Sequence, residues 1–545
     1  MKSTSVGGVL CLCVAVSSLI VGVDAQNPAP GSAAGGPQLR QAAYIKASNA
    51  EAADHFGCGG ALDGHTGNAV AISADGNTMA IGAHQESSNA KGVNGNQNNN
   101  AAYAAGAVYV YARTANGGWA QQAYVKAANA RQLANFGSVV ALSADGNTMA
   151  VSSHFESSAS KGVNGNQNDE SMPQAGAVYV FGRTGTTWAQ QAYLKASNTG
   201  RAPAPGVADD LGDGDQFGFS LAISGDGNTV AVGAISEDGP ASSINNLQFQ
   251  DNDSAASSGA VYVYTRTGSA WSQQAYVKSA NSRGGQLFGY GVALDMDGNT
   301  MAVTGYDEAG SGRTPNAIPD QRRGGSGAIY VFTRADGNWR QSGYLKGSRS
   351  EQGDSLGYSV TISEDGNTIA AGTADEDCYT LGVNPEGCDN DRAANTSSGA
   401  AYLWVRNGNN WTEQAFIKSS NPGLEDWFGV RMALSGDGNT LAISAALENS
   451  MGQGINPKQD DDLATDAGAV YFFTREGTTW TQKAFVKAAQ NETYDEFGSA
   501  LALSRDGKTM VVGARGEDSA AKGVNGNQRD NSAAEAGAAL VFSYN

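Results

Sequence analysis

The sequence has few basic residues and no cluster of them. Of 545 residues, 34 are Lys or Arg and 53 are Asp or Glu, which gives a formal net charge of −19. A chain this acidic repels a phosphate backbone, so we expect no nucleic-acid partner. The sequence also contains no nucleophile motif, no metal-ligand spacing and no Arg-Gly-Asp triplet. It therefore gives no motif from which an enzyme class can be inferred.

Long apolar runs are nearly absent. One run, residues 6–23, is preceded by a lysine and ends in Val-Asp-Ala at Ala25, a pattern typical of a secretory signal peptide cleaved after that residue. An uncleaved membrane anchor is the alternative, because the run approaches spanning length. We expect a signal peptide at 1–25, a flexible Pro/Gly/Ala-rich linker at 26–40, and a secreted protein with no further membrane span.

Cysteine is also scarce, with five residues. Cys11 and Cys13 lie in the expected signal peptide. Cys378 and Cys388 are ten residues apart, and in an oxidising compartment we expect them to form a local disulfide worth ~2–3 kcal/mol. Cys58 is left over, and we expect it to be buried.

From residue 41 onward one unit repeats seven times. A Phe-Gly pair (once Leu-Gly) begins at Phe56, Phe136, Phe217, Phe288, Leu356, Phe428 and Phe497. A Gly-Ala pair that opens an apolar run begins at Gly106, Gly176, Gly259, Gly327, Gly399, Gly468 and Gly537. A repeat of about 70–80 residues is typical of a β-propeller.

Each unit contains four strand signals. Strand A is the segment after Phe-Gly, strand B follows an Asp-Gly-Asn-Thr turn, strand C follows Gly-Ala, and strand D contains a tryptophan and ends in a lysine. Strands B and C are apolar at consecutive positions, which indicates sheets buried on both faces. Residues 44–46 form a strand D without a preceding unit, and the last unit lacks one, so the N-terminal strand should close the last blade.

We therefore predict an all-β fold, a seven-bladed β-propeller of four-stranded antiparallel blades over residues 41–545. The expected blades are 54–130, 131–200, 209–282, 283–349, 350–421, 422–490, and 491–545 completed by 41–48.

The repeated Phe-Gly and Gly-Ala pairs resemble the FG-GAP repeat propeller of the integrin α-subunit head and its secreted relatives. The resemblance spans nearly the whole expected mature chain. It implies a binding and adhesion scaffold, and it implies that ligands meet the face formed by the D–A and B–C loops.

Integrin-type repeats often carry an Asp-x-Asp-x-Asp-Gly calcium loop between strands A and B. The corresponding turns here read SADGNT, SGDGNT, DMDGNT, SEDGNT and SRDGKT. Calcium prefers six to eight oxygen ligands, and these turns supply too few carboxylates. We interpret them as hairpin turns, in which Asp bonds the backbone and Gly supplies a positive φ.

Carboxylates recur on the other face, where the long loops lie. A glutamate follows strand B in every unit: Glu86, Glu156, Glu237, Glu308, Glu376, Glu448 and Glu517. An aspartate precedes Phe-Gly in five units: Asp54, Asp215, Asp354, Asp426 and Asp495. A residue repeated in every blade is expected to serve the blade, because a reaction site needs unequal groups with different pKa values.

Departures from the repeat give the candidate ligand-binding residues. The B–C loops of blades one, two and seven share the sequence KGVNGNQ, a polar surface for a glycan or protein. His84 and His154 occupy equivalent positions in adjacent blades, and Trp427 is an unusual residue before Phe-Gly. The candidates are His84, Lys91, Asn94, His154, Lys161, Asn164, Trp427, Lys522 and Asn525. A zinc site formed by His55, His84, His154 and the neighbouring glutamates is a weaker alternative.

Two acidic loops are candidate calcium sites, because carboxylates cluster in them. One contains Asp209, Asp213 and Asp215, and the other contains Asp375, Asp377 and Asp389 beside the expected disulfide. No cofactor other than calcium is indicated.

The leading functional hypothesis is a secreted, non-catalytic, monomeric binding propeller whose partner is an extracellular protein or glycan. The alternatives are a propeller enzyme that acts on extracellular polysaccharide, as a glycoside hydrolase or lyase, and a structural module of a matrix or envelope. Near-identical blades suit a binding surface better than a catalytic pocket.

Overall fold

A computed structural model describes residues 38–59, 67–200, 214–388 and 396–545. The chain divides into two units, Met1–Gln38 and Leu39–Asn545, and the following description concerns the second. The expected signal peptide lies outside the described residues. Within them, no helix has the length and apolar character needed to cross a membrane.

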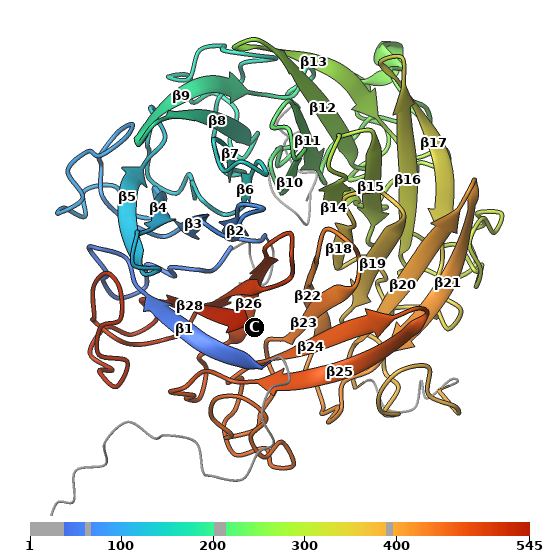
Figure 1. Cartoon of the computed structure of the whole chain (residues 1–545). Coiled ribbons are helices and arrows are strands. Elements are labelled where there is room, and N and C mark those ends of the chain that lie inside the picture. The colour runs from blue at the N-terminus through green and yellow to red at the C-terminus, as the bar shows by residue number, and fades with distance from the viewer. Residues whose placement is uncertain (1–37, 60–66, 201–213, 389–395) are drawn as a thin grey trace, which may run out of the picture. The chain divides into compact units, whose positions relative to one another are not determined.

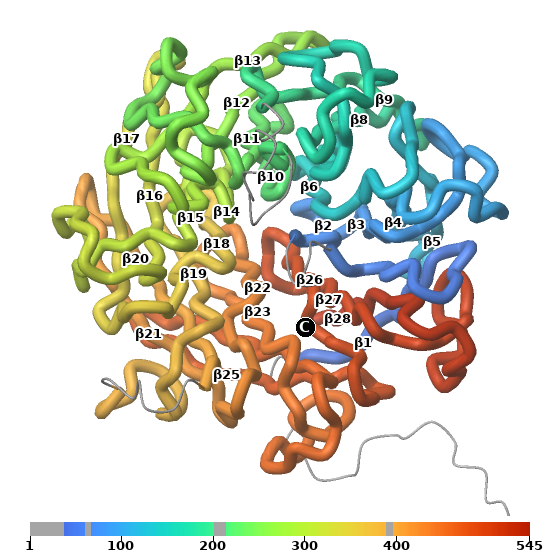
Figure 2. Tube along the Cα trace, turned by 180° about the vertical axis from the view of Figure 1, so that it is seen from behind, coloured from blue at the N-terminus to red at the C-terminus, as the bar shows by residue number. Residues whose placement is uncertain are grey.

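Seven four-stranded antiparallel sheets surround a central axis, which confirms the seven-bladed propeller (Figure 1). Figure 2 shows the same ring from behind. Strands run from the axis outward in the order A, B, C, D. Blades one to three contain β2 (Val70–Ile72), β3 (Thr78–Ala83), β4 (Ala107–Arg113), β5 (Trp119–Val125); β6 (Val140–Leu142), β7 (Thr148–Ser153), β8 (Ala177–Thr184), β9 (Thr187–Leu194); β10 (Ser220–Ile223), β11 (Thr229–Ala234), β12 (Ala260–Thr267) and β13 (Ala270–Val277).

Blades four to six repeat the same order. They contain β14 (Phe288–Leu294), β15 (Thr300–Gly305), β16 (Ala328–Ala335), β17 (Asn338–Leu345); β18 (Ser359–Ile362), β19 (Thr368–Thr373), β20 (Ala400–Asn407), β21 (Asn410–Ile417); β22 (Phe428–Leu434), β23 (Thr440–Ala445), β24 (Ala469–Glu476) and β25 (Thr479–Val486). One 3₁₀ turn, η1 (Leu247–Phe249), lies in the B–C loop of blade three.

The last blade joins the two ends of the propeller. It contains β26 (Phe497–Leu503), β27 (Thr509–Ala514), β28 (Ala538–Tyr544) and, as its outermost strand, β1 (Leu39–Ile45). β1 pairs antiparallel with β28, with Tyr44 opposite Leu540, and Figure 1 shows the blue first strand beside the red last one. This confirms the predicted closure, although β1 includes the last two residues of the expected linker, Leu39 and Arg40.

The hydrophobic core lies between neighbouring blades. Strands B and the first five residues of strands C are almost entirely buried, as their continuous apolar sequences predicted. The two sequence signatures meet across the blade boundary: the Phe136 amide donates to the Ala105 carbonyl at 3.1 Å, and a Cβ atom added at Gly106 would overlap the Phe136 carbonyl oxygen. Phe-Gly and Gly-Ala recur together because each pair seats one blade against the next.

Strand A is shorter than predicted in four blades. In blades one, two, three and five the extended pairing starts only after the Phe-Gly pair, at Val70, Val140, Ser220 and Ser359. In blades four, six and seven the strand includes Phe-Gly, but its register with strand B is interrupted after the Phe. The residues around Phe-Gly therefore lie at the end of the blade rather than within its sheet.

The Asp-Gly-Asn-Thr turns are hairpin turns, as expected from the oxygen count. In the second blade Asp145 accepts hydrogen bonds from Ser143 Oγ at 2.6 Å and from the Asn147 amide at 2.9 Å, and Gly146 has φ +64°. Burial opposes ionisation of Asp145, but hydrogen bonds from Ser143 and Asn147 outweigh it and lower its pKa. These turns and the C–D turns form one face of the ring, which we call the turn face.

Candidate functional site

The opposite face is formed by the D–A and B–C loops, and we call it the loop face. Strand B runs toward this face and ends in a short turn, which places the following glutamate just below the surface. Strand D ends at the same level with its lysine. In six blades the lysine Nζ contacts the glutamate carboxylate at 2.6–3.3 Å: Lys126–Glu86, Lys195–Glu156, Lys278–Glu237, Lys346–Glu308, Lys487–Glu448 and Lys46–Glu517.

These ion pairs are deeply buried. Each lysine side chain is fully enclosed, and burial lowers its pKa, to about 8 for Lys346, against the opposing pull of the glutamate. An asparagine from the preceding D–A loop adds a second donor; Asn129 Nδ2, for example, lies 3.3 Å from Glu156 Oε1. Removing one partner of such a pair leaves a buried charge without its partner, so each pair ties strand B to strand D within its blade. The asparagine contact links the glutamate to the preceding D–A loop.

The repeated aspartates lie beside the same pairs. Asp426 accepts the Gly423 amide at 2.6 Å, and the corresponding contact is made in three other blades by Asp54, Asp354 and Asp495. Burial, with a nearby glutamate, raises the pKa of Asp426 to about 8. At neutral pH these aspartates carry a proton for much of the time, which limits repulsion between neighbouring carboxylates.

The candidate calcium ligands that are described each have partners of their own. Asp215 occupies the repeated aspartate position and is 5% exposed, and burial raises its pKa well above the ordinary value. Asp377 Oδ1 accepts the Thr396 and Ser397 amides at 2.6 and 2.9 Å, whereas Asp375 Oδ2 faces the Tyr306 hydroxyl at 3.3 Å. Asp209, Asp213 and Asp389 lie outside the described residues, so calcium binding stays a prediction.

The KGVNGNQ loops run along the outer rim. Asn94 Oδ1 accepts the Tyr124 amide at 3.0 Å, and Asn164 and Asn525 make the same contact with Tyr193 and Tyr44. The asparagines therefore fix the loop to the outermost strand. Lys91, Lys161 and Lys522 are exposed, and so are the asparagines of the motif. Both residue types therefore remain accessible at this rim, although Lys161 also lies 3.4 Å from Asp251.

His84, His154 and Trp427 belong to a different place, the inner end of the loop face. At this inner end, three residues from each blade surround the central channel, and we call this set of residues the channel mouth. They are the residue before Phe-Gly (His55, Asn135, Gln216, Leu287, Ser355, Trp427, Glu496), the residue after it (Cys58, Ser138, Phe219, Tyr290, Tyr358, Val430, Ser499), and the residue after strand B (His84, His154, Ile235, Tyr306, Ala374, Ala446, Arg515). The seven residues at the first position all have φ between 50° and 57°.

The channel mouth is unequal around the ring. Its aromatic half comes from blades three to six, where Tyr290 stacks on Tyr306 with ring centroids 4.5 Å apart and Tyr358 lies 6.1 Å from Trp427. Phe219, Tyr290 and Tyr358 line a cavity of about 110 Å³.

The other half of the mouth is polar. The Arg515 guanidinium pairs with Glu496 at 2.8 Å, and the rings of His55 and His84 are 5.3 Å apart. Burial lowers the pKa of His84 to about 3 and that of His154 to about 4, so both imidazoles are neutral. Among the residues that the structure describes, neither ring nitrogen of His154 has a hydrogen-bond partner. The His84, His55 and His154 ligand atoms do not converge on one point within the described chain, and the zinc alternative gains no support.

Comparison with known families decides the classification. The family model named FG-GAP repeat matches residues 480–542, which run from strand D of blade six through β28, the unit that recurs around the ring. The chain is an FG-GAP repeat β-propeller. No curated protein sequence matches it.

Solved structures resemble the FG-GAP propeller only distantly. Hydrazine synthase from Kuenenia stuttgartiensis has a TM-score of 0.43 at 12% identity, with 81% of this chain and 91% of that chain covered. A putative 6-phosphogluconolactonase from Bacteroides uniformis has a TM-score of 0.40 at 10% identity, with 77% of this chain and 85% of that chain covered. A protein from Lactobacillus plantarum has a TM-score of 0.42 at 10% identity, with 78% of this chain and 86% of that chain covered.

Sequence reasoning missed the tyrosines and Phe219 of the channel mouth. They lie in separate blades, 68 to 71 residues apart between successive blades for Phe219, Tyr290 and Tyr358, and no local motif joins them. A usable signal existed: within a repeat that keeps Phe-Gly constant, the residues just before and after it change from blade to blade.

Proposed function

We propose that this FG-GAP propeller is a secreted, non-catalytic binding protein whose loop face takes an extracellular protein or glycan. The distribution of exposed apolar side chains carries the proposal. In the described chain, all eleven large exposed hydrophobic residues lie on D–A or B–C loops: Tyr103, Leu133, Leu247, Phe249, Ile318, Tyr379, Leu381, Leu424, Met451, Leu463 and Tyr494. Apolar side chains gathered on one face are typical of an interaction surface.

The repeated carboxylates support binding over polysaccharide hydrolysis. A glycosidase needs one carboxyl group to donate a proton and another that reaches the sugar. Six of the seven strand-B glutamates are instead held by lysines beneath the surface. The unequal groups of the loop face, which suit recognition, lie above them.

The test compares binding by the wild-type protein with binding by a loop-face variant. The double variant Leu381→Ser/Leu424→Ser removes two exposed side chains from adjoining loops, and Lys508→Ser is the matched control on the turn face. A glycan array and a panel of extracellular proteins serve as ligands. We expect at least tenfold weaker binding for the double variant, unchanged binding for the control, and an unmodified ligand after incubation. Shortened polysaccharide, or equal loss in both variants, would contradict the proposal.

A further inference from the structure

Blade five departs from the other blades at the point where strand B ends. In the described chain, Glu376 is the one strand-B glutamate that forms no ion pair with its strand-D lysine. Lys418 Nζ instead donates to Ser398 Oγ at 2.9 Å, and Glu376 Oε1 accepts the Cys378 amide at 3.1 Å. Glu376 is therefore released from the contact that fixes its counterparts.

Glu376 also lacks the second donor found in most blades. Where five other blades present an asparagine to the glutamate, blade five has Arg349. The Arg349 guanidinium turns away and donates to the Pro385 carbonyl at 2.6 Å and the Cys388 carbonyl at 3.2 Å. The arginine thus anchors the B–C loop from below and leaves the carboxylate to other partners.

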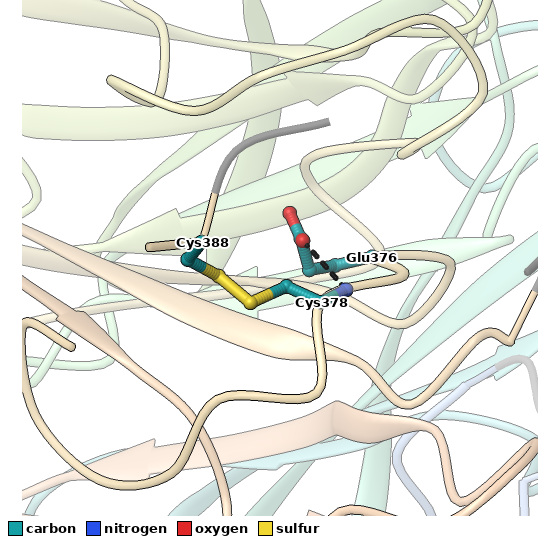
Figure 3. Close-up of side chains that lie close together, drawn as sticks. All are labelled: Glu376, Cys378 and Cys388. Carbon is teal, nitrogen blue, oxygen red and sulfur yellow. Dashed lines mark hydrogen bonds between the residues drawn. A yellow bond between two sulfur atoms is a disulfide. The ribbon is translucent and has the colours of Figure 1, made fainter. Parts of the chain in front are cut away.

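The groups that Glu376 meets are two cysteine sulfurs. Cys378 and Cys388 form the predicted disulfide, and both are less than 9% exposed. One Glu376 oxygen and the two sulfur atoms all lie within 4.8 Å of one another, the one such group of three in the described chain (Figure 3). Cys378 Sγ also accepts the Thr380 amide at 3.4 Å and contacts Thr380 Oγ1 at 2.9 Å. Donors aimed at a sulfur stabilise a thiolate.

We propose that the reduced form of this loop binds Zn²⁺, or a similar thiophilic divalent cation, through Cys378, Cys388 and Glu376. A thiol or phosphine reductant supplies two electrons, the S–S bond breaks, and each sulfur takes a proton. Binding of the cation then releases both protons and leaves two thiolates and one carboxylate as ligands. The fourth tetrahedral position is open to water, as in catalytic zinc sites with three protein ligands.

The geometry and the charges suit this cation. Zinc–sulfur bonds of about 2.3 Å place two thiolates about 3.8 Å apart in a tetrahedral site, so the sulfurs need to separate only modestly after reduction. Two thiolates, one carboxylate and a divalent cation carry a net charge of −1. The buried Lys418 ammonium, unpaired with Glu376, lies close enough to stabilise that charge, since Glu376 is the main electrostatic partner of this lysine. Thiolate ligands select zinc over calcium.

Cobalt(II) is the probe, because its bonds to thiolate give a near-ultraviolet charge-transfer band. The full chain is titrated before and after reduction with a phosphine, and a thiol assay verifies a gain of two thiols. We expect the band only after reduction, with one cobalt per chain, displacement by zinc, and complete loss in Cys388→Ser. A reduced protein that gives no band would overturn the proposal. So would a band that survives in Cys388→Ser, because cysteines elsewhere would then be responsible.

A pair of glutamate variants tests the carboxylate ligand. Glu376→Gln should weaken cobalt affinity at least tenfold, whereas Glu448→Gln, the equivalent change in blade six, should leave it unchanged. Thermal melting of both variants by circular dichroism checks that they are folded. Equal affinity in the two folded variants would remove Glu376 from the site and overturn the proposal as stated.

Discussion

The two faces of this propeller are built from the same repeat, but their sequences differ in how constant they are from blade to blade. On the turn face, six of the seven A–B turns place a serine two residues before the aspartate, and the aspartate accepts the serine hydroxyl in each. On the loop face, constancy is greatest below the surface, at the buried lysine and glutamate. Above them the sequence KGVNGNQ recurs only in blades one, two and seven, and the residues of the channel mouth change from blade to blade. Assembly of the ring constrains the first set, whereas the second set is free to vary between blades.

The largest expected effect comes from breaking the constant layer beneath the loop face. Glu156→Ala leaves Lys195 buried without its partner, and we expect the free energy of unfolding to fall by about 3–5 kcal/mol. Urea denaturation followed by tryptophan fluorescence measures it. Lys161→Ala, an exposed lysine of the same blade, is the control and should change stability by less than about 0.5 kcal/mol. Similar small losses in both variants would mean that the buried pair does not stabilise the ring.

A second test concerns the contact between blades. Gly106 has φ +78°, and an added Cβ would overlap the Phe136 carbonyl oxygen. We expect Gly106→Ala to cost about 2–3 kcal/mol, from strain and overpacking together. Gly92 has φ +70° with nothing within 4 Å of its Cβ position, so Gly92→Ala should cost only about 1–2 kcal/mol. The difference between the urea midpoints of the two variants measures the destabilisation that comes from the overlap with Phe136. Identical midpoints would mean that backbone strain alone accounts for the loss of stability.

The ring could be predicted from the sequence because each structural motif recurs seven times. Phe-Gly and Gly-Ala located the blades, and the unmatched strand at residues 44–46 located the closure. The pairing of Lys195 with Glu156 was not predicted, since the two residues belong to different strands and only the fold brings them to the same depth. The channel mouth was largely missed for a related reason: Phe219, Tyr290 and Tyr358 become neighbours only when three blades stand side by side.

The third prediction separates the buried acids of the loop face from the exposed ones by pH. The folded protein retains the Asp426 proton up to about pH 8, whereas an unfolded chain loses it near pH 4. Between these values unfolding releases a proton, so stability falls as pH rises, by up to about 1.4 kcal/mol per pH unit for this carboxyl. Asp426→Asn should make the fall of the urea midpoint between pH 5 and pH 8 less steep. Part of the slope should remain, because burial also raises the pKa values of Asp54, Asp354 and Asp495 to about 7, 8 and 7. Asp460→Asn, at an exposed loop position, should keep the wild-type slope. If Asp426→Asn kept the full wild-type slope, Asp426 would not be one of the carboxyl groups that hold a buried proton.

The smallest effect is expected on the turn face, where it tests whether that face only builds the ring. Asp145→Ala removes the hydrogen bonds to Ser143 and Asn147, and we expect a loss of about 1 kcal/mol in unfolding free energy. Leu381→Ser on the loop face should cost less than about 0.5 kcal/mol, because Leu381 is already 58% exposed. The order reverses for ligand binding, which Asp145→Ala should leave unchanged and Leu381→Ser should weaken. A turn-face variant that remained folded but lost binding would show that the turn face also contacts the ligand. The proposal that the turn face serves assembly and the loop face serves recognition would then be wrong.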